Sequence, residues 1–216
     1  MADVVGAEHA FHDADFVRGW AARFVPTPPR LALFDMILNE VLVRGGPAAH
    51  VVELGIGPGY LARHILERAD RLTYEGVDFS APMAAIARET LGVLAARVTF
   101  TTADLLDQTW PRALSRRPDA IVSTWSLHDL GSEAAVANVY ARCFETLADG
   151  GVLLNGDFIK PDGTPHAFEP GRFPIARHLS LLTAAGFADP RCLAHLEPNV
   201  ETPTPAENYA CFVAVR

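Results

Sequence analysis

The chain has 216 residues and a formal net charge of −8, and half of its residues are hydrophobic. This length and composition favour one domain with a large core, and the negative charge argues against a nucleic-acid partner held mainly by phosphate contacts. The sequence has three widely separated cysteines, no basic and apolar leader at its start, and no apolar run long enough to cross a bilayer, so we expect a reduced, cytoplasmic protein without a membrane partner.

Two helices are predicted before the first strand, at residues 8–25 and 30–44. A proline-rich segment ends the first helix and Gly45-Gly46-Pro47 ends the second. The first helix carries an aromatic stripe, which we expect to dock on the main core. The alternative is a flap over an apolar substrate pocket, lined by Phe11, Phe16 and Trp20. We therefore divide the chain into an N-terminal helical cap, residues 1–47, and a main domain, residues 48–216.

Strands and helices alternate from residue 50 onward. We predict strands at residues 50–54, 72–78, 97–101, 120–123 and 152–154, helices at 59–69, 81–94 and 132–147, and a weakly helical segment at 107–116. Ser80 and Ser132 stand where helix N-caps are expected. This order implies a parallel sheet with helices on both faces.

A long loop interrupts the alternation at residues 155–173, and loops of this length are usually functional or mobile. A helix follows at residues 174–185. Two further segments, residues 191–196 and 209–215, are separated by a proline-rich turn and can pair as a terminal antiparallel hairpin.

Three alternate glycines, Gly55, Gly57 and Gly59, follow the first strand and stand close behind Glu53. Such a turn can adopt positive φ angles and lets a ligand approach the backbone, while the helix that follows presents free N–H groups. A nicotinamide or flavin site needs a small residue where this chain, counted from Gly55, has Tyr60. A turn that needs glycine only for packing is the less favoured alternative.

The segment Glu53-Leu54-Gly55-Ile56-Gly57-Pro58-Gly59 resembles motif I of the class I S-adenosylmethionine-dependent methyltransferases, and the resemblance extends from about His50 to Asp157. It implies an α/β fold: a Rossmann-like, doubly wound, seven-stranded and mostly parallel sheet with a C-terminal antiparallel hairpin and an N-terminal helical addition. It also implies S-adenosyl-L-methionine as the cofactor and S-adenosyl-L-homocysteine as its product. The residues that it assigns to cofactor binding are Glu53, Gly55, Gly57, Gly59, Asp78, Phe79, Met83, Asp104, Leu105 and Trp125.

Three acids carry most of this resemblance, and two of them have structural alternatives. In the family, an acid after the second strand binds both ribose hydroxyls and one after the third meets the adenine, which would be Asp78 and Asp104. Glu53 would lie near the methionine amino group, but it can also bond the turn amides, and Asp104 can cap the segment after it. Asp78 is harder to explain structurally, because an unpaired acid that ends a buried strand is unfavourable.

A general base is needed only when the methyl acceptor arrives protonated, as a phenol or alcohol does. His128 is the natural candidate, because its ordinary pKa lies near ~6.5. Asp129 either orients His128 or replaces it as the base. A purely structural role for His128 has equal weight. His166 is a further candidate on the substrate side, because it lies in the loop expected to cover the site.

The segment after the fourth strand argues against several acceptor classes. It lacks the Asn-Pro-Pro-aromatic sequence of amino-group methyltransferases, no Asp-Asn pair follows Asp129, and no cysteine stands beside it. We therefore expect no metal and no covalent intermediate. A small organic acceptor remains, with oxygen ahead of nitrogen or carbon. The aromatic residues of the covering segments favour an aromatic or hydrophobic metabolite.

Two other functions stay open at this point. One is a relative that binds S-adenosylmethionine without transferring methyl. The other, the least favoured because of Tyr60, is a nicotinamide-dependent oxidoreductase. We expect no nucleic-acid partner, and the sequence leaves a homodimer open.

Overall fold

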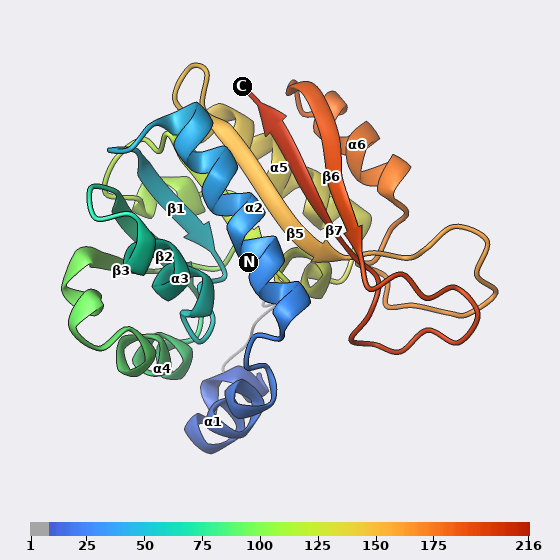
Figure 1. Cartoon of the computed structure of the whole chain (residues 1–216), viewed down its shortest axis with the longest axis horizontal. Helices are drawn as coiled ribbons and strands as arrows, with labels where there is room; N and C mark the ends of the chain where they lie inside the picture. The colour runs from blue at the N-terminus through green and yellow to red at the C-terminus, as the bar shows by residue number, and fades with distance from the viewer. Residues whose placement is uncertain (1–8) are drawn as a thin grey trace.

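A computed structural model describes residues 9–216, and its centre is one seven-stranded sheet in the order β3-β2-β1-β4-β5-β7-β6 (Figure 1). The strands are β1 (His50–Leu54), β2 (Thr73–Asp78), β3 (Val98–Thr102), β4 (Ala120–Thr124), β5 (Val152–Phe158), β6 (Ala188–Leu196) and β7 (Tyr209–Val215). Strands β1 to β5 pair in parallel, and β7 runs antiparallel to both β5 and β6. The predicted doubly wound sheet with a C-terminal antiparallel hairpin is confirmed.

Helices cover both faces of the sheet, as expected. The helices are α1 (Ala14–Arg23), α2 (Pro28–Gly45), α3 (Tyr60–Arg68), α4 (Ala81–Leu91), α5 (Glu133–Thr146) and α6 (Ile175–Ala184). One apolar cluster joins α2, α3 and α4 to one face, and a second joins α5 and α6 to the other. Ser80 and Ser132 cap α4 and α5 as predicted, by accepting from Met83 N and Ala135 N. Among residues 9–216, no helix has the length and apolarity needed to span a bilayer.

The N-terminal segment is divided where one continuous helix was predicted. A short 3-10 turn, Ala10–His12, precedes α1, and Asp13 separates them because its side chain accepts from Phe16 N at 2.8 Å. The start of the predicted helix, residue 8, lies outside the described residues. Helix α1 lies at the end of the molecule to which β1 points (Figure 1). The ion pair between Arg18 and Glu89 joins it to α4.

Helix α2 belongs to the core of the main domain in its packing. Leu33, Ile37 and Val41 are fully buried in the cluster that also contains residues of β1, β4 and β5. The boundary that we drew at residue 47 stays a prediction.

Strand β5 is longer than predicted, and the loop expected at residues 155–173 begins only after Phe158. Antiparallel pairing with β7 extends it, with Asn155 opposite Phe212 and Asp157 opposite Ala210. The polar residues of this segment suggested a loop, yet Asn155 and Asp157 are completely buried and hydrogen-bonded. The correction matters for function, because Asp157 now stands at the sheet edge where the parallel strands end.

Candidate functional site

A cavity of about 520 Å³ opens at the carboxyl ends of β1, β2 and β4. The glycine turn forms one wall, and the segment around α1, the turn after β4 and the loops after β5 and β6 form the others. Gly55 and Gly57 adopt φ angles of +69° and +52°, which few residues other than glycine tolerate. A Cβ atom on Gly55 would overlap Ser126 Oγ. Gly59 (φ +81°) packs on Ala87 instead of lining the cavity.

Asp78 lies on the cavity wall at the end of β2. The sequence analysis assumed that this acid is unpaired, but the structure gives it two hydrogen bonds. Its Oδ2 accepts from Gly57 N at 3.0 Å and its Oδ1 from Ser80 N at 2.9 Å. Burial raises the pKa of Asp78, and these two hydrogen bonds oppose the rise. A carboxylate has about four lone-pair positions, so two remain for ligand hydroxyl groups.

Glu53 is buried beside Asp78 and also borders the cavity. Its Oε2 accepts from the hydroxyl group of Tyr74 at 2.8 Å, so its partner is this phenol instead of an amide of the glycine turn. Burial raises the pKa of Glu53 well above its usual range, and the nearby Asp78 adds to this rise. A buried carboxyl group in this position is suited to receive a ligand's ammonium group.

The side chains that the resemblance places around an adenine share the same cavity. Phe79, Met83, Asp104 and Leu105 all line it. Asp104 Oδ1 accepts from Leu106 N at 2.9 Å, which fixes the turn after β3. The ring of Phe79 meets the edge of Phe11 at a centroid distance of 6.3 Å, so the N-terminal segment lies against this end of the cavity.

Aromatic side chains of the N-terminal segment form part of the cavity wall. Phe11 and Trp20, both predicted, line it together with Phe24, whose ring stacks on Trp20 at 4.3 Å. Phe16 is 43% exposed and is not on the wall. His166 is likewise exposed and does not line the cavity, and its Nε2 atom lies 3.2 Å from Glu201 O.

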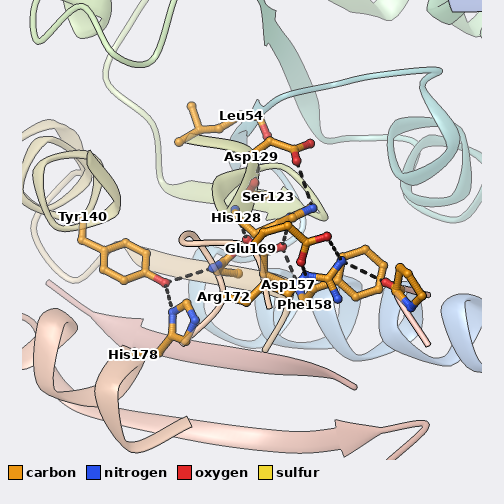
Figure 2. Close-up of polar contacts among 12 residues, drawn as sticks. Leu54, Ser123, His128, Asp129, Tyr140, Asp157, Phe158, Glu169, Arg172 and His178 are labelled. Atoms are coloured by element: carbon orange, nitrogen blue, oxygen red, sulfur yellow. Dashed lines mark hydrogen bonds and ion pairs between the residues drawn. The ribbon is translucent and has the colours of Figure 1, made fainter. Parts of the chain in front are cut away.

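His128 stands between two carboxylates at the other end of the cavity (Figure 2). Its Nδ1 lies 2.7 Å from Asp157 Oδ1, its backbone N–H donates to Asp157 Oδ2 at 3.0 Å, and its Nε2 lies 3.2 Å from Asp129 Oδ1. Burial by itself lowers the pKa of His128, but Asp157 and Asp129 outweigh burial, so the net pKa lies above its ordinary value. Burial raises the pKa of Asp129, and His128 opposes this rise.

Arg172 ties the loop after β5 to the loop between β6 and β7. Its guanidinium lies 4.3 Å over the ring of Phe158, pairs with Glu169 and donates to Pro205 O at 2.9 Å (Figure 2). Burial lowers the pKa of Arg172. Arg172, Pro205 and Phe158 border the cavity, so both loops close it near His128.

Comparison with known proteins decides the family. Residues 51–151 match a family model described as a methyltransferase domain, and this segment contains the glycine turn, Asp78, Asp104 and His128. Residues 51–151 form a class I S-adenosylmethionine-dependent methyltransferase domain.

Several proteins with assigned names are similar to this methyltransferase domain. Over 106 residues the chain is 37% identical to trans-aconitate 2-methyltransferase of Delftia acidovorans, covering 49% of this chain and 37% of that protein. Among solved structures, magnesium protoporphyrin IX methyltransferase of Synechocystis, with bound cofactor, has 17% identity and a TM-score of 0.70, covering 100% of this chain and 98% of that one. N-methyltransferase NodS of Bradyrhizobium japonicum has 16% identity and a TM-score of 0.65, covering 88% and 97%.

These comparisons establish the fold and support S-adenosylmethionine as the cofactor, but they do not identify the methyl acceptor. Structural likeness at such identities establishes the fold. The chain spans 37% to 53% of the length of the curated relatives that it matches. The names of these relatives refer to different methyl acceptors.

The sequence analysis missed several residues of this site, among them Asp157, which is buried behind His128, and Arg30, which lines the cavity. Asp157 was missed because its segment was taken for a loop. Arg30, on the first turn of α2, was missed because a single arginine near a helix start has no distinguishing pattern; the structure puts its guanidinium on the cavity wall. The signal for Asp157 was present in the strand-like residues Val152 to Leu154 before it.

Gly171 holds the loop after β5 against His128, and replacing it with alanine should destabilise the protein. A Cβ atom at this position would overlap the backbone carbonyl of His128. We expect Gly171→Ala to lower the free energy of unfolding by about 1–3 kcal/mol, measured by urea denaturation. Gly19→Ala is the control, because no atom lies within 4 Å of a Cβ there. Equal stability of the Gly171→Ala variant and the wild type would contradict this packing.

Proposed function

We propose that the chain transfers the methyl group of S-adenosylmethionine to a hydroxyl oxygen of a small aromatic or hydrophobic acceptor, leaving S-adenosylhomocysteine. The observation that carries this proposal is the pairing of His128, which lines the cavity, with the fully buried Asp157 behind it, 2.7 Å between Nδ1 and Oδ1. A hydroxyl acceptor must lose a proton as its oxygen attacks, and an oriented histidine is suited to take it. The cofactor, when bound, supplies a methyl group on a positively charged sulfur.

The residues of the cavity fit this cofactor in order along its length. Phe79 and Met83 offer apolar surface for the adenine, and Asp104 offers an acceptor for its amino group. Asp78 has lone pairs left for both ribose hydroxyls. Gly55 and Gly57 leave room against the turn, and Glu53 is placed for the ammonium group.

The acceptor end supports a base-assisted transfer. Asp157 accepts from His128 N, from Phe158 N and from the His128 ring, so a buried carboxylate fixes the ring with Nδ1 as donor. The other ring nitrogen, Nε2, is then the atom that takes the hydroxyl proton, and Asp129 beside it stabilises the resulting imidazolium. Phe158, whose ring centroid lies 5.1 Å from that of His128, gives this end an apolar lining that excludes water.

Nitrogen or carbon as the accepting atom is the alternative, and so is a relative that binds the cofactor without transferring methyl. A neutral amine attacks without prior loss of a proton, and a relative that transfers no methyl needs no base, so neither requires the His128–Asp157 pair. A carbon acceptor must give up a proton, as a hydroxyl does. Oxygen therefore accounts better than nitrogen for a buried histidine held between two carboxylates.

Two measurements test the proposal. In calorimetric titrations we expect S-adenosylmethionine and S-adenosylhomocysteine to bind and NADH not to bind. With a radiolabelled methyl group, we expect transfer to phenols or alcohols in a panel that also holds amines. Tight NADH binding without binding of either sulfur ligand would contradict the cofactor. Transfer only to amines, or to no class at all, would contradict the hydroxyl acceptor.

A further inference from the structure

Arg30 is a buried cation on the cavity wall that the proposed reaction leaves without a role. It is 8% exposed, and among residues 9–216 it forms no hydrogen bond or ion pair. Its guanidinium carbon lies 5.0 Å from the ring centroid of Trp125 and 5.5 Å from that of Phe24. The two aromatic rings stabilise the positive charge, but they accept none of the guanidinium N–H bonds.

An anionic ligand would satisfy those N–H donors. A guanidinium group has five donors in a planar fork. No Arg30 nitrogen is among the fully enclosed, unpartnered side-chain atoms of residues 9–216, so its donors reach the cavity, where a ligand can meet them. The fork matches the two oxygens of a carboxylate in a bidentate pair. A doubly charged phosphate suits this cavity less, because Glu53, Asp78, Asp104 and Asp129 border it. The other arginine on its wall, Arg172, already pairs with Glu169.

The position of Arg30 fits one end of an elongated ligand. Trp125, over which Arg30 lies, precedes Ser126, and Ser126 touches the glycine turn at Gly55. Asp78 holds the other side of this turn through Gly57 N. A ligand lying along the turn would therefore meet a hydroxyl-binding carboxylate at Asp78 and a guanidinium group at Arg30.

We infer that Arg30 is a carboxylate-binding residue of this cavity. The inference rests on the proposed function, because two carboxylates can enter the site in that reaction. One is the amino-acid carboxylate of the cofactor, and the other is an acidic group on the acceptor. Both present the same two oxygens to the guanidinium, and the ligands that lack them tell the two sources apart.

The first arm of the experiment uses two nucleosides and two variants. S-adenosylhomocysteine carries the carboxylate, whereas 5′-methylthioadenosine shares the adenosine but lacks the amino-acid part. If Arg30 holds the cofactor, Arg30→Gln should weaken binding of S-adenosylhomocysteine by about 10- to 100-fold and leave methylthioadenosine unchanged, with partial recovery in Arg30→Lys. Arg63→Gln is the matched control, since Arg63 is exposed and pairs with Glu67.

The second arm tests the acceptor. The wild type and Arg30→Gln, both saturated with S-adenosylhomocysteine, are titrated with 4-hydroxybenzoate and with its methyl ester. If Arg30 holds an acidic acceptor, the free acid should bind the wild type at least about tenfold more tightly than the ester, and Arg30→Gln should remove this difference.

The outcomes separate this inference from the proposed function. Failure of the wild type to bind either nucleoside contradicts the proposed function. If the wild type binds both, an unchanged affinity of Arg30→Gln for S-adenosylhomocysteine, with no preference for the free acid that depends on Arg30, overturns the inference alone. An equal loss for both nucleosides would show a disturbed cavity and would also count against the inference.

Discussion

Replacing Asp78 with alanine should raise the dissociation constant of S-adenosylhomocysteine by about 100-fold or more. The expected loss has two parts. A hydrogen bond to a charged group contributes about 1.5–3 kcal/mol, and two ribose hydroxyls would each lose one such acceptor. The variant also removes the bond from Gly57 N, which holds the glycine turn against the end of β2, and the bond from Ser80 N at the start of α4. Calorimetric titration measures the change directly.

An analogue without the ribose hydroxyls separates these two parts. If Asp78 binds the sugar, the wild type should discriminate strongly against an S-adenosylhomocysteine analogue in which both hydroxyls are replaced by hydrogen, and Asp78→Ala should bind both ligands equally. If Asp78 only positions the glycine turn, the variant should lose the same factor for both. An unchanged affinity for S-adenosylhomocysteine itself would remove Asp78 from the site.

The cofactor end of the site could be predicted from sequence because its requirements are local. Gly55 and Gly57 adopt positive φ, and such positions favour glycine whatever the rest of the chain does. Asp78 stands at the end of a predicted strand, and the carboxyl ends of the strands in a parallel sheet lie side by side. Alternation of strands and helices then brings these separate segments together without knowledge of any side-chain contact.

The acceptor end could not be predicted in the same way, because it depends on contacts between distant segments. Asp157 reaches His128 because β5 continues to Phe158, where it pairs with β7, a strand more than fifty residues later in the chain. Arg30 reaches the cavity through the packing of α2 on the sheet. Phe16 shares helical spacing with Trp20, yet it lies on the exposed side of α1. Spacing alone does not say which member of an aromatic stripe meets a cavity.

Tyr74 illustrates the same limit inside the cofactor end. Glu53 was expected at the amino-acid part of the cofactor, but no local pattern links it to a phenol 21 residues away. Strands β1 and β2 are adjacent and parallel, with Gly76 opposite Glu53, and this register brings the side chain of Tyr74 within 2.8 Å of the carboxyl group. The contact gives Glu53 a hydrogen-bond donor within the protein, which limits the free-energy cost of burying a carboxyl group.

Substituting His128 with alanine should reduce methyl transfer to a hydroxyl acceptor by about 100- to 10,000-fold, with little change in S-adenosylhomocysteine affinity. The phenol or alcohol identified in the transfer panel serves as the acceptor. Because His128 accepts a proton only in its neutral form, kcat/KM of the wild type should rise with pH and level off above the raised pKa of His128. An unaltered rate in His128→Ala would leave this residue structural.

Asp157→Asn tests whether the buried carboxylate positions that base. Removing its negative charge lowers the pKa of His128, so the rising limb of the pH profile should move to lower pH while the plateau falls. The His128–Asp157 ion pair stabilises the folded state fully below ~6.5, the ordinary pKa of histidine, and this stabilisation is lost as the pH rises through the folded-state pKa. The variant should therefore lose more unfolding free energy near pH ~5.5 than at alkaline pH.

Histidine ¹⁵N chemical shifts give a readout that does not depend on turnover. In the wild type the His128 ring should titrate above its ordinary pKa and keep Nδ1 protonated in the neutral form, because Asp157 accepts from that atom. Asp157→Asn should lower the titration midpoint and mix the two tautomers, whereas Asp129→Asn should lower the midpoint and leave Nδ1 protonated. A midpoint and tautomer unchanged in Asp157→Asn would show that Asp157 fixes only the backbone of the turn after β4, through His128 N.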